Sequence, residues 1–325
     1  MVDNKKKIVG IGSALVDLLL KAEDDWVASL GAEKGGMTLV DNEFVEDALK
    51  KAKHPPEVVS GGSACNTIVG IGMLGGQASF VGKCGEDEFG RIFTSDLQES
   101  GVEPLLFTSS APTGKVLSVV TPDAQRTMFT HLGASTELDP QMITPKLFED
   151  AAVVVVEGYL LFNPDLIMAT VQAAKTAGAK ISLDLASFEV VHNSRALLDK
   201  IVAEYVDILI ANEDEAEAYC GHRKEEKAVA RLMENAPTAI LKVGERGCFI
   251  CCDREIYRIK AQTGGAPLDT TGAGDLWAAG FLWGLVNNYS MEKCGELGSA
   301  CGYEVCQVLG AKIPEAGWQR IKSLL

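Results

Sequence analysis

Residues 269–275 join small side chains to a carboxylate just before an apolar run. Gly272, Ala273 and Gly274 would open a helix there, and the free N–H groups at the positive end of a helix can bind a phosphate. Asp275 would lie in the first helical turn, where its carboxylate could accept a proton from an attacking hydroxyl. The alternative is an aspartate that only stabilises the helix N-terminus. The spacing alone leaves both open, and the motifs below favour catalysis.

A second glycine-containing turn precedes the apolar run of residues 67–74. Here Gly61 and Gly62 are followed by Ser63 and Asn66. Paired glycines let the backbone approach a ligand closely, and an asparagine offers both a donor and an acceptor. The pattern looks like a site for hydroxyl groups, although taken by itself it is explained more simply by an ordinary turn before a helix.

Asp17 interrupts the otherwise apolar run of residues 14–20. An unpaired buried charge is costly, so this carboxylate needs partners. Vicinal sugar hydroxyls would satisfy it, and so would a nearby lysine or backbone amides. Arg126 could close over a phosphate from a β-rich segment, although an exposed arginine on a strand is the default interpretation.

Two further polar segments follow apolar, strand-like runs. Asn212 and Glu215 belong to a carboxylate cluster that suits either the dipole of a helix or a hydrated magnesium ion. Lys242, Gly244 and Gly247 form a glycine-bounded turn between two apolar runs. That turn fits contact with a nucleotide or merely a hairpin, and its basic residues slightly favour the nucleotide.

Residues 70–75 match the dinucleotide fingerprint Gly-x-Gly-x-x-Gly literally. A true fingerprint follows a strand and opens a helix, whereas these glycines are expected inside and at the end of a helix. Gly10 and Gly12 do follow a strand, but Leu15 stands where the third glycine is required. The sequence therefore gives little support to a nicotinamide oxidoreductase. It also contains no P-loop motif.

The elements that must position these residues alternate along the chain. An opening strand at residues 7–12 is joined, from residue 151 onward, by strand 151–156, helix 164–177, strand 179–185, helix 195–205 and strand 206–211. Such alternation implies a parallel sheet with helices on both faces and ligands beyond the carboxyl ends of the strands. We therefore expect one crevice to hold the candidate residues.

Residues 104–130 differ, because β-branched residues alternate there around a turn at residues 121–123. This pattern predicts an antiparallel hairpin outside the main sheet. Together with residues 14–20 and 36–42 it is expected to form a small, discontinuous β lid. The whole chain, residues 1–325, is expected to be a single α/β domain that includes this lid.

The 325 residues are 47% hydrophobic and carry a net charge of −15. This length and composition can bury a large core, and the negative charge opposes binding to nucleic acid or anionic membranes. The apolar stretch after the basic N-terminus is too short for a signal peptide, and no segment approaches the roughly 20 apolar residues of a membrane span. We expect a soluble, cytoplasmic protein without nucleic-acid or membrane partners.

Nine cysteines include a pair, Cys248 and Cys251, whose spacing can bind zinc or support redox chemistry. No second pair at ligand spacing accompanies it. Residues 247–252 also fit a buried strand, in which these two side chains point to opposite faces. We therefore predict that the pair belongs to the core.

Taken together, these motifs resemble the ribokinase and adenosine kinase family, also called the phosphofructokinase-B family of carbohydrate kinases. The family's two signatures appear at residues 61–66, running on to 82–90, and at residues 269–275. Its Asn-x-x-Glu element appears as Asn212 and Glu215, in the expected order. The likeness spans nearly the whole chain. It implies a ribokinase-like three-layer α/β sandwich with a mainly parallel central sheet and a small β-sheet lid.

The resemblance also implies ATP with Mg²⁺ and in-line transfer of the γ-phosphoryl group to a primary alcohol. Asp275 would be the base, and the backbone of Gly272, Ala273 and Gly274 would hold the phosphate. The residues implied to bind the acceptor are Ser13, Asp17, Gly61, Gly62, Ser63, Asn66 and Arg126. Those implied to bind the nucleotide are Asn212, Lys242, Gly244, Gly247 and Thr271. Glu215 would hold Mg²⁺ through water, and Asp269 with Thr271 matches a monovalent-cation site, for K⁺, of some members.

The acceptor is expected to be a small nucleoside or sugar. Ser63 stands where ribokinases tend to have lysine, and residues 12–17 look like the adenosine-kinase branch, particularly its bacterial members. Ser13, however, stands where well-known adenosine kinases have asparagine. The 5′-hydroxyl of adenosine is the leading expectation, with a ribose- or fructose-type sugar or a catalytically silent binding relative as alternatives. Related lids occur in monomers and in lid-paired homodimers.

Overall fold

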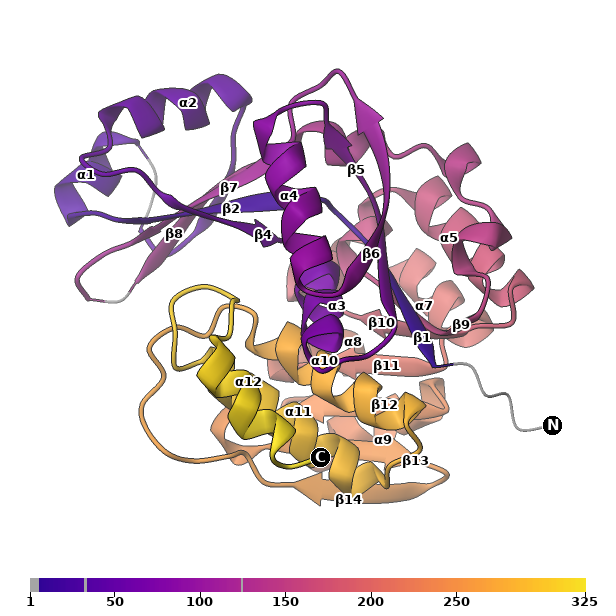
Figure 1. Ribbon diagram of the computed structural model, residues 1–325. Coiled ribbons are helices and arrows are strands. Elements are labelled where there is room, and N and C mark those ends of the chain that lie inside the picture. The colour runs from indigo at the N-terminus through magenta and orange to yellow at the C-terminus, as the bar shows by residue number, and fades with distance from the viewer. Residues whose placement is uncertain (1–5, 32–33, 124) are drawn as a thin grey trace.

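A computed structural model describes residues 6–31, 34–123 and 125–325, in which the strands form one large and one small sheet (Figure 1). The large sheet of these described residues has nine strands in the order β14-β13-β12-β11-β10-β9-β1-β5-β6. All neighbours from β6 to β12 pair in parallel, whereas β13 and β14 are antiparallel additions at one edge. The predicted large, mainly parallel sheet with a smaller second sheet is thus confirmed.

The strands of the large sheet are short and mostly buried. Their bounds are β1 Lys7–Ile11, β5 Ala78–Gly85, β6 Val102–Ser109, β9 Ala151–Val156, β10 Lys180–Asp184, β11 Ile208–Ala211, β12 Thr238–Lys242, β13 Cys248–Cys252 and β14 Glu255–Ile259. Strand β9 has the sequence Ala-Ala-Val-Val-Val-Val. Its residues are all apolar because both faces of the strand are covered by the rest of the protein.

Helices cover both faces of this sheet and create two hydrophobic cores. Successive side chains of β1 point to opposite faces of the sheet, so Ile8 belongs to one core and Val9 to the other. The α-helices are α1 Asp24–Ser29, α2 Asn42–Lys51, α3 Ser63–Met73, α4 Glu88–Glu99, α5 Pro164–Thr176, α6 Phe188–Asn193, α7 Arg195–Glu204, α8 Glu213–Cys220, α9 Glu225–Asn235, α10 Ala273–Val286, α11 Met291–Val305 and α12 Glu315–Lys322. The 3₁₀ helices are η1 Gly133–Glu137, η2 Pro140–Met142, η3 Pro145–Phe148, η4 Gly158–Phe162 and η5 Gly244–Arg246.

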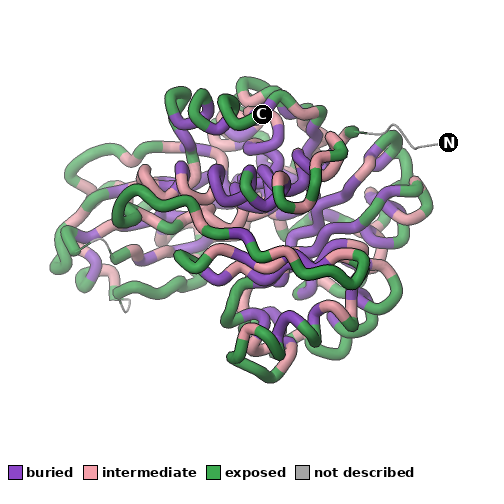
Figure 2. Tube along the Cα trace, turned by 90° about the horizontal axis from the view of Figure 1, so that it is seen from below, coloured by how far each residue is buried: buried purple, intermediate pink, exposed green. Residues whose placement is uncertain are grey.

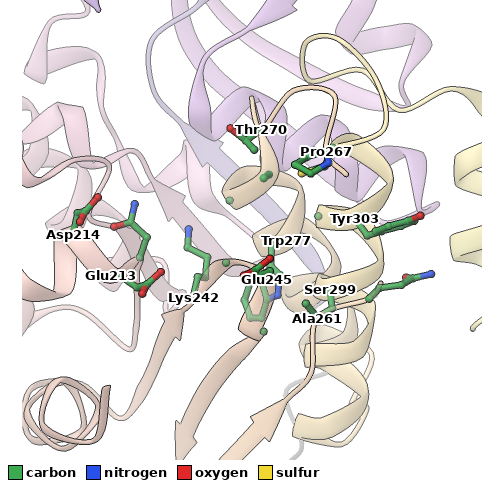
Figure 3. Close-up of a pocket in the computed structure, with 18 of the residues that line it drawn as sticks. Glu213, Asp214, Lys242, Glu245, Ala261, Pro267, Thr270, Trp277, Ser299 and Tyr303 are labelled. Carbon is green, nitrogen blue, oxygen red and sulfur yellow. The ribbon is translucent and has the colours of Figure 1, made fainter. Parts of the chain in front are cut away.

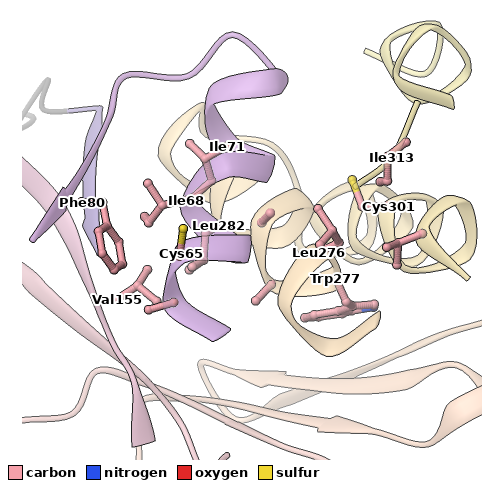
Figure 4. Packing of buried hydrophobic residues seen from close by; sticks show 14 of the residues in the cluster. Cys65, Ile68, Ile71, Phe80, Val155, Leu276, Trp277, Leu282, Cys301 and Ile313 are labelled. Carbon is pink, nitrogen blue, oxygen red and sulfur yellow. The ribbon is translucent and has the colours of Figure 1, made fainter. Parts of the chain in front are cut away.

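Helices α3 and α10 pack against each other on one face of the sheet (Figure 4). Ile68 of α3 lies near Phe80 of β5, and Leu276 of α10 packs in the same buried cluster. The N-terminal ends of both helices therefore meet near the carboxyl end of β1. Figure 2 shows that buried segments run through the middle of the molecule and that exposed segments lie outside.

The small sheet has the strand order β3-β8-β7-β2-β4 and projects from one side of the large sheet (Figure 1). Its strands are β2 Leu15–Lys21, β3 Met37–Leu39, β4 Glu57–Gly61, β7 Gly114–Val120 and β8 Arg126–His131. β7 and β8 form the antiparallel hairpin around residues 121–123. β2 follows β1 after a short connection, so the chain passes from one sheet to the other at Ser13.

The predicted excursion 104–130 is wrong in its first part. Residues 102–109 form β6, which pairs in parallel with β5 at the edge of the large sheet. The physical reason is helix α4, a crossover between β5 and β6 that permits parallel pairing. Strand β4, which the sequence reading did not include, forms an edge of the small sheet instead.

Cys248 and Cys251 lie on β13, as the buried-strand interpretation predicted. Cys248 belongs to one hydrophobic core and Cys251 to the other, so the two thiols point to opposite faces. Burial raises the pKa of Cys248 to about 12 and that of Cys251 to about 11, so both thiols are protonated at neutral pH. In the part of the chain that the structure describes, no helix is both long and apolar enough to cross a membrane.

Candidate active site

The candidate residues gather where parallel strands of the large sheet end. Ser13 follows β1, Glu157 follows β9, Asp184 ends β10, Asn212 follows β11 and Lys242 ends β12. Because the carboxyl ends of parallel strands share one edge of a sheet, these side chains border a common crevice. The start of α10 lies at the same edge, because a Cβ on Gly274 would come within 2.8 Å of Lys242 Nζ.

The Asp275 carboxylate lies between the first turns of α10 and α3. Ser63 Oγ donates a hydrogen bond to its Oδ1 at 2.7 Å, and Asn66 Nδ2 donates to its Oδ2 at 2.9 Å. Thr67 Oγ1 donates to the main-chain oxygen of Asp275 at 3.1 Å. Burial raises the pKa of Asp275 to about 6, although the two side-chain donors oppose that shift. This carboxylate is therefore ionised at neutral pH but basic enough to accept a proton.

The backbone at the start of α10 presents unsatisfied donors. Gly272, the N-cap, has φ 71°, a left-handed conformation that a glycine adopts without a steric penalty. Ala273 N donates to the oxygen of Thr270 at 3.1 Å. In the described residues the N–H groups of Gly274 and Asp275 have no hydrogen-bond acceptor. This arrangement leaves backbone donors for an anion at the helix N-terminus.

Asp269 holds the loop before α10 in place. Its Oδ1 accepts from Thr271 N at 3.0 Å and from Thr271 Oγ1 at 2.7 Å. Its Oδ2 accepts from Gly310 N at 2.8 Å. Arg126 reaches this loop from β8, because its Nη1 donates to Thr271 Oγ1 while its Nη2 donates to Ser118 Oγ at 2.9 Å. The small sheet thus contacts the loop that carries the candidate catalytic residues.

Asp17 is only 5% exposed and lies beside the glycine pair. A Cβ on Gly61 would come within 2.6 Å of the Asp17 carboxyl carbon, and a Cβ on Gly62 would lie 2.5 Å from Ser13 O. Burial raises the pKa of Asp17 to about 6, with the positive charge of Arg126 opposing. Within the described part of the chain no hydrogen bond is donated to this carboxylate. Its oxygens are therefore available to a ligand.

Glu157 is a buried carboxylate that the sequence places after a strand at the expected crevice without giving it a role. It is 4% exposed, and its oxygens accept from Ser13 N at 3.4 Å and from Ala64 N at 3.2 Å. It thereby joins the connection after β1 to the start of α3. Burial raises its pKa to about 7. The feature of the sequence that could have revealed a role for Glu157 was its place directly after the predicted strand 151–156.

Replacing Glu157 by glutamine is expected to change how stability depends on pH. The carboxyl group ionises near 4.5 in an unfolded chain but near 7 in the fold, so its stabilising effect is complete below pH 4.5 and disappears as the pH rises to about 7. As the pH rises over that interval, the free energy of unfolding of Glu157→Gln should therefore increase by up to roughly 3 kcal/mol relative to that of the wild type. Urea unfolding at about pH 5 and about pH 8 measures this difference. The exposed Glu149→Gln is the control, and an equal offset at both pH values would contradict the account.

Glu215 and Asn212 form a reciprocal cap at the start of α8. Asn212 Oδ1 accepts from Glu215 N at 2.9 Å, while the Glu215 oxygens accept from Asn212 N at 2.8 Å and from Asn212 Nδ2 at 2.6 Å. Burial and the neighbouring Asp184 raise the pKa of Glu215 to about 7. The contacts of Glu215 are therefore those of a residue that caps a helix N-terminus, as one of the two sequence interpretations expected. That Glu215 binds magnesium stays a prediction.

A cavity of about 740 Å³ adjoins this edge of the sheet (Figure 3). It is lined by four of the residues predicted to bind a nucleotide, namely Asn212, Lys242, Gly244 and Gly247. Thr271 is not among its lining residues, but its neighbour Thr270 is. The cavity reaches Ala273 and Gly274 at the start of α10. An elongated ligand in it would therefore end beside the backbone donors of α10.

The predicted acceptor residues lie outside that cavity. Asp17 and Asn66 are not among its lining residues, and Asp275 lies between them and the cavity end at Gly274. In the described residues no group of three or more histidine, cysteine, aspartate or glutamate side chains is arranged to hold a metal ion. Mg²⁺ commonly keeps several waters and binds substrate phosphates, so it needs no such group.

A mainly parallel α/β fold with a buried carboxylate beside free backbone donors at a helix N-terminus is compatible with phosphoryl transfer to an alcohol group. Residues 7–316 match the family model described as pfkB family carbohydrate kinase. The chain belongs to this family, and it is an ATP-dependent kinase.

Solved structures and a curated relative agree with this assignment. The structure matches the adenosine kinase from Sinorhizobium meliloti with TM-score 0.89 and 31% identity, covering 99% of this chain and 100% of that chain. It matches a probable sugar kinase from Rhizobium etli with TM-score 0.89 and 31% identity, covering 99% of each chain. The adenosine kinase of Saccharomyces cerevisiae is 26% identical over an alignment of 330 positions that covers 94% of this chain and 96% of that protein.

Proposed function

We propose that this kinase transfers the γ-phosphoryl group of ATP to the 5′-hydroxyl of adenosine. The observation that carries the proposal is the position of Asp275, which directly follows Gly274 in the cavity lining and lies close enough to the Asp17 carboxylate for its charge to raise the pKa of that group. The similarity to the adenosine kinases of Sinorhizobium meliloti and yeast supports a nucleoside as the acceptor.

In the proposed mechanism Asp275 takes the proton of the acceptor hydroxyl. Ser63 and Asn66 donate to the two carboxylate oxygens and so fix their direction before the substrate arrives. The acceptor oxygen then attacks the γ-phosphorus, and ADP leaves from the opposite side. The N–H groups of Gly274 and Asp275 would stabilise negative charge on the transferred group.

Asp17 and the glycine pair would position the acceptor. A carboxylate can accept hydrogen bonds from two neighbouring hydroxyls, and the oxygens of Asp17 have no donor in the described residues. Gly61 leaves room beside that carboxylate, and Glu157 keeps the backbone of Ser13 in place nearby. A ribose with vicinal hydroxyls fits these donors and acceptors.

The nucleotide would occupy the cavity between Asn212, Gly244 and the start of α10. Magnesium, when bound, neutralises charge on the phosphates. The carboxylates of Asp214 and Glu213 line the cavity and would offer oxygen ligands of the kind that this ion prefers, directly or through water. Glu215 is 3% exposed and its oxygens already accept hydrogen bonds from Asn212, so it would contact the ion only through water.

A monovalent cation is proposed for the loop around Asp269. Asp269 Oδ1 accepts hydrogen bonds from Thr271 in this loop and Oδ2 accepts one from Gly310 N in another segment, so a K⁺ ion would join an arrangement that is already ordered. Comparing activity with and without K⁺ tests this part of the proposal.

The small sheet is proposed to act as a lid through Arg126. Arg126→Ala should raise the KM for adenosine about tenfold, because a charge-assisted hydrogen bond to Thr271 is lost and the sheet is held less firmly over the acceptor. Ser118→Ala removes only the contact that orients the guanidinium and should have a smaller effect. Steady-state kinetics measure both variants. An unchanged KM in Arg126→Ala would contradict the lid role.

An ADP-release assay across adenosine, other nucleosides, ribose and fructose tests the proposed substrate. The highest kcat/KM is expected with adenosine. A free sugar is the second candidate, supported by the similarity to the probable sugar kinase of Rhizobium etli. Absence of ADP release with every acceptor would favour a catalytically silent binding protein.

A further inference from the structure

Lys242 ends β12 beside the candidate phosphate site. Its Nζ donates to Asp184 Oδ2 at 3.0 Å, and the two side chains are 15% and 18% exposed. A Cβ on Gly274 would lie 2.8 Å from that Nζ. The ammonium group therefore adjoins the first turn of α10, at the end of the cavity that Lys242 and Gly274 both line (Figure 3).

The charges around Lys242 keep it protonated. Burial disfavours the ammonium form, but the nearby carboxylates of Asp184, Glu215 and Asp275 outweigh that effect and raise its pKa above the ordinary value. Lys242 thus carries a fixed positive charge within reach of the backbone donors at the start of α10. The simplest role of such a lysine is to neutralise Asp184 and Glu215.

The rest of the cavity gives a reason to expect more. Its lining includes the carboxylates of Glu213, Asp214, Glu217 and Glu245. Where no metal ion neutralises them, these negative charges oppose the entry of a triphosphate. Arg223 also lines it, but its side chain is 81% exposed and paired with Glu217. Of these two lining cations, Lys242 is the one beside Gly274, where the proposed transfer takes place.

We propose that Lys242 is a catalytic cation that contacts the transferred phosphoryl group, and that Asp184 is the positioning residue that holds its ammonium. This rests on the proposed phosphoryl transfer. During that transfer the bond between the acceptor oxygen and the γ-phosphorus forms, the bond to the bridging oxygen of ADP breaks, and the acceptor proton passes to Asp275. Lys242 keeps its proton throughout and stabilises the negative charge on the oxygens of the phosphoryl group while that group is transferred.

The first test is Lys242→Met, which keeps the length of the side chain and removes its charge. We expect kcat to fall at least about 100-fold. Calorimetry without acceptor should show that the variant binds ATP about tenfold or more weakly, whereas its affinity for ADP changes less than about threefold, because ADP lacks the contacted group. Equal weakening for both nucleotides would overturn the proposal.

The double variant Asp184→Asn/Lys242→Met separates direct contact from simple charge neutralisation. It removes both charges of the pair, so no buried carboxylate at position 184 is left unpaired. We expect it to fold, as judged by circular dichroism and the thermal midpoint, and to remain as inactive as Lys242→Met. Recovery of wild-type kcat would overturn the proposal, since the lysine would then serve only to neutralise Asp184.

Two further outcomes keep the test decisive if Lys242→Met fails to fold. Lys242→Arg retains the charge and should keep the preference for ATP over ADP, whereas the double variant should lose it. Equal preference in the two variants would overturn the proposal. A wild-type protein that releases no ADP with any acceptor would count against the proposed function, but the ATP and ADP affinities would still test the contact with Lys242.

Discussion

Replacing Asp275 by asparagine is expected to lower kcat about 1000-fold or more while leaving the protein folded. Asparagine is nearly the same size and can still accept a hydrogen bond from Ser63 or Asn66. It cannot take up the proton of the acceptor hydroxyl, so the positioned base is lost. The ADP-release assay with saturating adenosine and ATP measures the effect.

The matched control is Asp165→Asn, which changes an exposed aspartate in the first turn of another helix, α5. If Asp275 only stabilised a helix N-terminus, the two variants would lose similar, small amounts of stability and keep their activity. We expect instead that the Asp275 variant is at least as stable as the wild type at neutral pH, because burial raises the pKa of this carboxyl to about 6 and makes its charge unfavourable there. Retention of full activity in Asp275→Asn would contradict the assigned role.

The second large effect is expected for Asp17→Asn, with kcat/KM for adenosine falling about 100-fold to 1000-fold. An amide has one accepting oxygen in place of two and turns a donor toward the acceptor's hydroxyls. Losing a charge-assisted hydrogen bond and leaving a buried group unpaired accounts for a loss of this size. Most of it should appear in the KM for adenosine, with the KM for ATP unchanged.

A substrate change sharpens this test. An adenosine analogue that lacks one ribose hydroxyl should react poorly with the wild type but lose little further activity with Asp17→Asn, because the contact is already gone. Asp123→Asn, an exposed position in the hairpin of the small sheet that pairs with Lys34, is the control. Independent, additive losses from the variant and the analogue would show that Asp17 does not contact the hydroxyls.

The large sheet could be predicted because its strands are buried on both faces and its crossover helices have a regular period. Strand β9 and helix α5 lie within a residue of their predicted bounds. The edge of the sheet at β6 could not, because α4 was not recognised and the chain was followed into the hairpin directly. Strand β3, Met37–Leu39, lies within the predicted lid segment 36–42, although its three exposed residues carry no burial pattern that would fix its bounds.

The candidate site shows a similar division. Motif spacing singled out Ser63, Asn66 and Asp275, but it could not show that the first two donate to the carboxylate of the third, since the partners are separated by more than 200 residues along the chain. Glu157 and Asp184 lie at the ends of predicted strands at the expected crevice, but no role could be assigned to either of them from the sequence, for a physical reason. A carboxylate after a strand gains its meaning only from the backbone amides or the lysine that the fold brings to it.

The most direct test of this account is adenosine-dependent ADP release by the wild-type protein, with the product identified by ³¹P NMR. One ADP should form for each adenosine consumed, the phosphate should be on the 5′-oxygen, and ATP alone should release almost no ADP. ADP release that does not require an acceptor, or phosphate on another oxygen of adenosine, would contradict the proposed geometry around Asp275.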